Sequence, residues 1–231
     1  MFANNEIGTI EPINKIGEIA RKHQIYFHTD SVQAVSNVKI NVKEMNIDLL
    51  SMSGHKFHAP KGIGVLYVKE GVKIEKLQDG GHQEKDLRAG TENVTGIVGM
   101  AKAIELAYNN FDERINKIID LRNYCINRLK EEFKDIKING DEIDRLPGNI
   151  NVSFNGIEGE EILLYLDEKG ICVSSGSACS SGSDEPSHVL LAIGLQKELA
   201  NSTIRITLGN ENTKEEIDYF IETLKEFSKI K

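Results

Sequence analysis

Helical periodicity alternates with short runs of strand-forming residues through the first half of this 231-residue chain. Pro12 opens a segment to Gln24 in which isoleucines recur on one face, which predicts a helix with proline in its first turn. Strands are expected at residues 25–29, 48–52 and 64–68, and a long helix at 93–108. Because strands and helices alternate, the chain is predicted to form a layered α/β domain with a largely parallel sheet.

The second half of the chain has a different order of elements. Helices are expected over residues 112–133 and 158–168, and strands over 136–138, 149–154, 171–174 and 204–208. The last helix is expected to start at Thr213, because Thr213 and Glu216 have the T-x-x-E spacing of a capping box. A smaller α+β domain is therefore predicted from Phe111, so that the two domains are residues 1–110 and 111–231.

Charge and cysteine content exclude several classes of protein. A net charge of −8 argues against direct binding of nucleic acid, because phosphate recognition favours a basic surface. Apolar runs such as Ile162–Leu166 are far shorter than the roughly 20 residues of a membrane helix, so no membrane partner is expected. The three cysteines, Cys125, Cys172 and Cys179, have no C-x-x-C spacing. We therefore expect no disulfide scaffold and no metal site, and a reducing, cytoplasmic compartment.

Asp30 directly follows a predicted strand, where ligands bind in open α/β sheets. A carboxylate at this position can keep a pyridinium nitrogen protonated, and that charge makes the ring an electron sink. The alternative is a local role, because aspartate is also a favoured helix N-cap. The residue alone leaves both interpretations open.

Ser53-Gly54-His55-Lys56 follows the next predicted strand. A lysine there can form a Schiff base if partial burial lowers its pKa. The hydroxyl of Ser53 and the imidazole of His55 can donate to a phosphate, and Gly54 lets the backbone approach closely. The alternative is a polar turn with a solvated lysine, which is the usual state of this residue type.

Two further segments contain donors for anions. Residues 80–91 form a glycine-flanked loop ending at Thr91, which can present a hydroxyl and backbone N–H groups or can be a plain surface loop. Arg205 lies in a predicted strand that is otherwise suited to burial. Its planar donors fit a carboxylate ligand or a structural ion pair equally well.

Residues 174–183 are the most unusual segment, because a single cysteine lies among small, flexible residues. Such a run cannot pack a core, and its conformational freedom is costly to remove, so a mobile loop is expected. The thiol of Cys179 is therefore a candidate nucleophile or group carrier, although the segment can also be a linker with an incidental cysteine. Cys125 and Cys172, on an apolar helix face and in a predicted strand, are predicted to be inert core residues.

Taken together, the order and spacing of these motifs resemble the cysteine desulfurases of the NifS/IscS type, which belong to the class V aminotransferases. The matching segments are residues 4–9 (NNEIGT), 28–34 (HTDSVQA), 53–56 (SGHK), 88–91 (RAGT) and 174–179 (SSGSAC). The resemblance covers essentially the whole chain. It implies the fold-type I architecture of aspartate aminotransferase, with residues 1–110 as the C-terminal part of the large domain that binds pyridoxal 5′-phosphate (PLP) and residues 111–231 as the small domain.

The resemblance also implies a role for each matching residue. Lys56 resembles the Schiff-base lysine, and Cys179, in a long-loop context, resembles the cysteine that carries the persulfide. The remaining implied cofactor contacts are Asp30 to the pyridinium, Gln33 and Asn5 to the cofactor, Ser53 and His55 to its phosphate, and Thr91 to the phosphate of the partner subunit. Asn5 and Arg205 are implied to hold the substrate carboxylate.

The activity implied by the resemblance is removal of sulfur from L-cysteine, which gives L-alanine and a persulfide on Cys179. The implied partners are a second copy of the chain and a sulfur acceptor, either an iron–sulfur scaffold or a tRNA-thiolation protein. An alternative among enzymes is a selenocysteine lyase or another class V aminotransferase relative.

The chain begins abruptly, because Met1-Phe2-Ala3 leads at once into the NNEIG motif. The family that it resembles has a substantial N-terminal region before this motif, so we expect an N-terminal truncation. A hypothesis of a different class follows: the chain is an inactive fragment or one half of a split gene and acts only as a binding partner.

Overall fold

The structure is a computed structural model that describes residues 1–176 and 185–230. It has two compact units, and each is described by itself. Unit 1 consists of Met1–Phe2 and Glu11–Phe111, and unit 2 of Ala3–Ile10 and Asp112–Lys231. Residues 3–10 therefore pack with the second half of the chain although they lie near its start.

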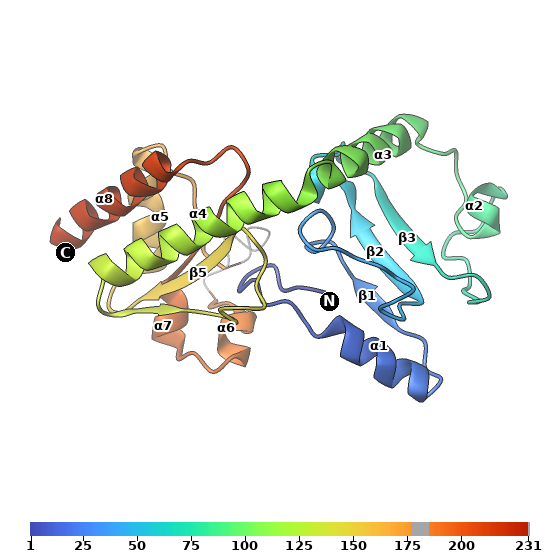
Figure 1. The fold of residues 1–231 in the computed structure, drawn as a ribbon, viewed down its shortest axis with the longest axis horizontal. Coiled ribbons are helices and arrows are strands. Elements are labelled where there is room, and N and C mark those ends of the chain that lie inside the picture. Colours follow the sequence, from blue (N-terminus) through green and yellow to red (C-terminus); the bar gives the residue numbers. More distant parts are fainter. Residues whose placement is uncertain (177–184, 231) are drawn as a thin grey trace. The chain divides into compact units, whose positions relative to one another are not determined.

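Unit 1 contains a three-stranded sheet in the order β1 (His28–Asp30), β2 (Leu49–Ser53) and β3 (Gly64–Val68) (Figure 1). β1 and β2 are parallel, whereas β2 and β3 are antiparallel. The expectation of a largely parallel sheet is therefore wrong for the described strands, because the short connection after β2 reverses the chain direction. The other elements of unit 1 are α1 (Ile13–Lys22), η1 (Gly54–Phe57), α2 (Gln83–Asp86) and α3 (Val94–Tyr108).

The first strand is shorter than expected. It begins at His28, and the strand-forming residues before it lie outside the sheet. The backbone N–H of Phe27 donates to the carboxylate of Asp48 at 3.0 Å, whereas its carbonyl oxygen accepts from the N–H groups of Asp48 and Leu49. The small core of this unit places Phe57 of η1 and Met100 of α3 in one buried cluster. This packing holds η1, which directly follows β2 in the sequence, against α3.

Unit 2 contains an antiparallel sheet in the order β4 (Ile136–Ile138), β5 (Asn149–Phe154) and β6 (Thr203–Thr207). Apolar side chains from α4 (Phe111–Glu132), α5 (Gly159–Glu168) and α8 (Lys214–Ile230) join those of the sheet in one core. Two short helices, α6 (His188–Ala192) and α7 (Lys197–Asn201), precede β6. The helix α8 begins with the predicted capping box, because Glu216 N–H donates to Thr213 Oγ1 and Thr213 N–H donates to Glu216 Oε2.

The central strand β5 separates two environments in unit 2. All six of its residues are buried, and they alternate in polarity along the strand. Ile150, Val152 and Phe154 belong to the apolar core. Asn149 and Asn151 point to the opposite face, because side chains alternate across a strand. They form hydrogen bonds there, so β5 holds a core on one face and a polar network on the other.

The strand expected over 171–174 is absent from the described residues. Ser174 forms a single bridge to Arg205 of β6, and no longer ladder forms there. Cys172 is consequently exposed, and its prediction as a core residue is wrong.

Candidate functional site

Asp30 and Ser53 end the two parallel strands of unit 1. In the register of these strands Asp30 is opposite Ser51, so both strands reach the same edge of the sheet. Asp30 is exposed there, and its Oδ1 accepts a hydrogen bond from the N–H of Val32 at 2.9 Å. This is a turn contact and not a helix N-cap, because residues 32–37 form turns. The carboxylate stays at the surface, where a ligand can reach it.

The helical turn η1 presents Lys56 and His55 at the same edge. Both side chains are exposed in this chain, so Lys56 does not show the partial burial expected of a Schiff-base lysine, whereas Phe57 next to them is buried and anchors the turn. Ser53 Oγ and His55 Nδ1 lie 2.9 Å apart in a hydrogen bond. A methyl group at Gly54 would lie 2.9 Å from a side-chain carbon of Ile63, so only glycine fits this approach. The sheet edge thus combines an amine, a carboxylate, a hydroxyl and an imidazole.

Gln33 and Thr91 are the remaining predicted site residues of unit 1. Gln33 is half-buried in the turn after β1, and its backbone carbonyl accepts from Asn37 Nδ2 at 3.0 Å. Thr91 is exposed in the segment before α3. The backbone before it is held by a hydrogen bond from Gly90 N–H to Gln83 Oε1 at 3.0 Å. The roles of Gln33 and Thr91 remain predictions.

Asn5 and Arg205 come together in unit 2. Residues 3–10 form a tight turn in which Asn4 Oδ1 accepts from the N–H groups of Glu6 and Ile7. Arg205, on β6, donates from Nη1 to the carbonyl oxygen of Asn5 at 3.0 Å. The two residues expected at a substrate carboxylate are therefore neighbours, although 200 positions separate them in the sequence.

The polar face of β5 supports this turn. Asn149 and Asn151 each donate from Nδ2 to the carbonyl oxygen of Glu6, at 3.1 and 3.3 Å. Behind them, Arg145 donates from Nη1 to Asn149 Oδ1 at 3.3 Å. Burial lowers the pKa of Arg145 to about 10. The backbone that presents Asn5 is thus held by a buried network of amides and a guanidinium.

Glu6 is a residue that the sequence interpretation overlooked. Its side chain is only 2% exposed, and the hydroxyl of Ser187 donates to its Oε2. A single charged residue among the uncharged residues 3–10 is a weak signal in the sequence. Its partner lies 181 positions away, so no local pattern could have identified the pair.

The three cysteines differ in how the structure places them. Cys125 is fully buried in the core of unit 2, as predicted, and burial raises the pKa of its thiol to about 12. Cys172 is exposed. Cys179 lies outside the described residues.

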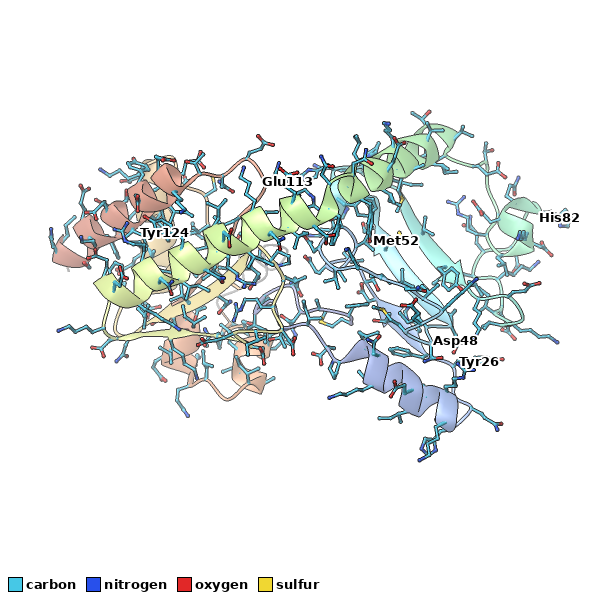
Figure 2. All side chains as sticks on the ribbon, in the orientation of Figure 1. Tyr26, Asp48, Met52, His82, Glu113 and Tyr124 are labelled. Atoms are coloured by element: carbon cyan, nitrogen blue, oxygen red, sulfur yellow. The ribbon has the colours of Figure 1, made fainter. Side chains whose placement is uncertain are left out.

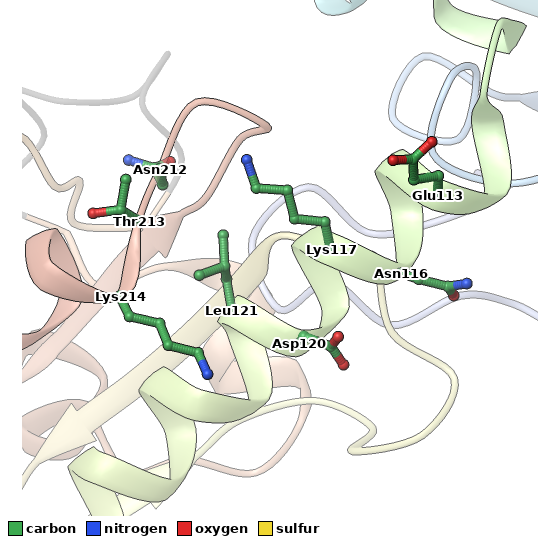
Figure 3. A pocket seen from close by; sticks show the side chains of 8 residues that line it. All are labelled: Glu113, Asn116, Lys117, Asp120, Leu121, Asn212, Thr213 and Lys214. Atoms are coloured by element: carbon green, nitrogen blue, oxygen red, sulfur yellow. The ribbon is translucent and has the colours of Figure 1, made fainter.

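A separate pocket of about 600 Å³ lies in unit 2 between α4 and the segment that enters α8 (Figure 3). Its lining combines two ammonium groups, Lys117 and Lys214, with two carboxylates, Glu113 and Asp120. The Lys117 ammonium already donates to the carbonyl oxygen of Asn210. This mixed lining selects no single class of ligand, and none of the predicted site residues contributes to it.

Within residues 1–176 and 185–230, no three His, Cys, Asp or Glu side chains are grouped as a metal ion would require. Among the helices that the structure describes, none is long and apolar enough to cross a membrane. Figure 2 shows the side chains of both units.

Comparison with known proteins gives the family. Residues 1–220 match the family described as "Aminotransferase class-V". A relative from Clostridium botulinum (strain Hall), named "Cysteine desulfurase IscS", is 56% identical over 231 residues. The alignment covers 99% of this chain and 58% of that relative. The chain belongs to the class V aminotransferase family, and it spans little more than half the length of this curated relative.

Solved structures share the fold. The chain is similar to the "NifS-like protein from Rickettsia africae ESF-5" with a TM-score of 0.90 and 35% identity, covering 99% of this chain and 60% of that one. It is also similar to a structure entitled "SspA in complex with cysteine", with a TM-score of 0.72 and 36% identity, covering 92% of this chain and 58% of that one. The fold is therefore that of the NifS-like, PLP-dependent fold-type I proteins.

Proposed function

We propose that the protein is a PLP-dependent cysteine desulfurase, which removes sulfur from L-cysteine and leaves L-alanine and a persulfide on Cys179. The observation that carries this proposal is the common sheet edge at which Asp30, Ser53, His55 and Lys56 lie. The 56% identity to a relative named cysteine desulfurase supports it. A cysteine-bound structure among the similar folds supports the choice of substrate.

The donor set at this edge fits PLP. The cofactor has an aldehyde, a pyridine nitrogen and a phosphate, which call for an amine, a carboxylate and hydrogen-bond donors. Lys56 supplies an exposed amine and Asp30 an exposed carboxylate. Ser53 and His55 supply a hydroxyl and an imidazole already held in one hydrogen bond. In the proposed site Gln33 and Thr91 add further contacts to the cofactor.

When bound, PLP supplies an electron sink for the charge that develops at the substrate carbon. Lys56 Nζ would carry the proton to and from that carbon, and the Asp30 carboxylate would keep the ring nitrogen protonated. Asn5 and Arg205 would orient the substrate through its carboxylate. The arginine is well suited to this, because its planar donors match a carboxylate in pairs.

Sulfur transfer would then take place at Cys179. Its thiolate attacks the sulfur of L-cysteine, so that an S–S bond forms while the substrate C–S bond breaks. The electron pair of the broken bond stays with the substrate carbon, which takes up a proton and leaves in L-alanine. No lysine, arginine or histidine lies between Val173 and Pro186, so the charge that activates the thiol must come from outside this segment.

The proposal extends to the setting of the enzyme. We infer a homodimer in the cytoplasm, in which Thr91 reaches the phosphate site of the partner subunit. The persulfide would pass to an iron–sulfur scaffold or to a protein of tRNA thiolation.

Covalent labelling tests the cofactor site. Borohydride reduction of the PLP-loaded protein should fix a pyridoxyl group on the peptide that contains His55 and Lys56. Lys56→Ala should remove the label, whereas Lys61→Ala, the same change at an exposed lysine just beyond η1, should retain it. A label that persists in Lys56→Ala and disappears in Lys61→Ala would refute the assignment.

A pulse of L-cysteine followed by mass spectrometry tests the carrier cysteine. We expect a persulfide on Cys179 in the unchanged protein and in Cys172→Ser. Cys179→Ser should bind PLP as before and release no sulfide. Sulfide release that survives Cys179→Ser would show that residues 174–183 are only a linker.

A further inference from the structure

Two consecutive carbonyl groups, those of Asn5 and Glu6, are held by side chains from two neighbouring strands. Arg205 of β6 donates from Nη1 to the carbonyl oxygen of Asn5 at 3.0 Å. Asn149 and Asn151 of β5 donate from Nδ2 to the carbonyl oxygen of Glu6, at 3.1 and 3.3 Å. The peptide groups on both sides of Glu6 are thus fixed, and with them the direction in which the chain presents Asn5.

The register of the sheet explains why these side chains act together. Asn151 is directly opposite Arg205 in the antiparallel pair of β5 and β6. Opposite residues have their side chains on the same face of a sheet, and so do residues two apart in one strand. Asn149 and Asn151 are only 5% and 0% exposed, so their amides need partners inside the protein. One face of the sheet therefore directs three buried or half-buried donor groups at one stretch of backbone.

Both asparagine amides are themselves oriented by donors. Asn149 Oδ1 accepts from Arg145 Nη1 at 3.3 Å, and Asn151 Oδ1 accepts from Asn139 Nδ2 at 2.8 Å. A guanidinium can only donate, so it fixes which end of the Asn149 amide faces it. The nitrogen of each amide is thereby left to donate to the carbonyl oxygen of Glu6.

We propose that Asn149 and Asn151 are positioning residues for the substrate carboxylate. By holding the backbone next to Asn5, they keep this residue beside Arg205 and so set the affinity for ligands that carry a carboxylate. The inference rests on the proposed function, in which Asn5 and Arg205 bind that group. Loss of one amide should therefore weaken binding of a carboxylate and leave binding of an amine without a carboxylate unchanged.

Amide hydrogen exchange in PLP-free protein tests whether the asparagines hold the turn. The main variant is Asn149→Asp, which keeps the shape of the side chain and its contact with Arg145 but replaces the donor by an acceptor. The N–H groups of Glu6 and Ile7, which donate to Asn4 Oδ1, should exchange roughly tenfold faster, as expected for the loss of one hydrogen bond. Unchanged exchange at both groups would overturn the inference.

Ser153→Ala is the matched control for a purely structural loss. Ser153 is completely buried in the same strand, and its hydroxyl forms hydrogen bonds with Asn139 and Thr203, which lie outside residues 3–10. Its replacement removes a buried polar contact and should lower the stability of unit 2. Hydrogen exchange at Glu6 and Ile7 should stay as in the unchanged protein.

The affinities of two small amines for the PLP-loaded protein test the effect on the ligand. L-Alanine has an amine and a carboxylate, and ethylamine is the same molecule without the carboxylate. Their dissociation constants are measured from the change in visible absorption of the bound cofactor. Asn149→Asp should raise the dissociation constant of L-alanine roughly tenfold and that of ethylamine by less than about twofold. Asn151→Ala should have the same effect in the range of roughly twofold to tenfold, and Ser153→Ala should change neither constant.

The outcomes separate this inference from the proposed function. Equal changes for both amines, or an unchanged affinity for L-alanine in the folded variants, would overturn the positioning role. If Asn149→Asp does not fold, Asn151→Ala decides the question. An unchanged protein that binds L-alanine no more tightly than ethylamine would instead overturn the proposed role of Asn5 and Arg205. An unchanged protein that binds no PLP would overturn the proposed function and with it the carboxylate as ligand, and the exchange rates would still show whether the asparagines hold the turn.

Discussion

Helices α3 and α8 differ in how many of their apolar side chains are buried against the rest of the chain. In α8 the apolar residues recur at helical spacing, and the five that define its stripe are all buried: Ile217, Phe220, Ile221, Leu224 and Phe227. In α3 apolar residues lie on every side of the helix. Met100 and Ala103 are buried, but Val94 and Val98 are 64% and 62% exposed.

The two helices suit different positions in a fold. A helix with one apolar stripe is typical of the surface of a domain, whereas a helix that is apolar all round is typical of a buried position. One apolar cluster of unit 2 joins fifteen buried side chains from its sheet and helices, whereas the described cluster that contains Met100 and Ala103 of α3 joins five. Unit 2 therefore contains its own core. The apolar residues on all sides of α3, in contrast, are typical of a helix that is buried more completely than α3 is in this chain.

The largest effect is expected in the core of unit 2. Leu129 on α4 is completely buried, so Leu129→Ala should lower the free energy of unfolding by about 2–5 kcal/mol through lost burial and the cavity left behind. Urea denaturation combined with amide hydrogen exchange would measure the loss and locate it in unit 2. The matched control is Leu164→Ala, the same change at a side chain that is 58% exposed on α5 of this unit. Equal losses in the two variants would contradict the self-contained core.

A pH-dependent effect should follow from Cys125. Burial raises the pKa of its thiol from 9.0 to about 12. In the unfolded chain the thiol loses its proton as the pH rises above 9, while the folded protein keeps it. The unfolded state then binds fewer protons, so stability is fully present below pH 9 and falls as the pH rises toward 12.

Between pH 9 and 11 this fall should approach about 1.4 kcal/mol per pH unit. Cys125→Ala should lack this part of the pH dependence, although its stability at pH 7 is lower because of the smaller side chain. The measurement is the difference in unfolding free energy between the two proteins at several pH values, which cancels the contributions of lysine and tyrosine. Parallel curves would mean that the Cys125 thiol is reached by solvent in the folded protein.

Local patterns allowed much of the fold to be predicted. The strands at 64–68, 136–138 and 149–154 have the predicted bounds, because each run of strand formers finds a sheet partner along its length. The predicted capping box of α8 forms because its two partners are three residues apart. The run at 171–174 is also composed of strand-forming residues, but it gains only the bridge from Ser174 to Arg205 of β6, so composition alone did not predict how much of the run would pair.

The candidate site could be predicted only in part. The sequence predicted Asp30 and Lys56 as site residues because strand ends mark the ligand-binding edge of a parallel pair, and both residues do lie at that edge, although their roles stay predictions. It could not show that Arg205 holds the backbone of Asn5, or that Glu6 meets Ser187, since these contacts join segments about 200 residues apart. Such contacts depend on the complete fold and leave no periodicity in the sequence.

The smallest effect is expected on the exposed face of α3. Val98→Gln places a polar side chain where the valine is 62% exposed, and glutamine favours a helix more than valine does. The free energy of unfolding should change by less than about 0.5 kcal/mol, as for most surface substitutions. Binding of an apolar dye should decrease, because part of an exposed apolar face is removed.

The matched variant is Ile221→Gln on α8, where the isoleucine is completely buried and the loss should be several times larger. Thermal unfolding of both variants at two protein concentrations gives the comparison directly. If Val98→Gln cost about 2 kcal/mol or more, the face of α3 would behave as a buried surface. A cost that grows with protein concentration would assign that cover to a second copy of the chain, since only association depends on concentration. In both cases the exposed face of α3 would be covered in solution, as the apolar stripe of α8 is. The difference between the two helices would then hold only for a single copy of the chain.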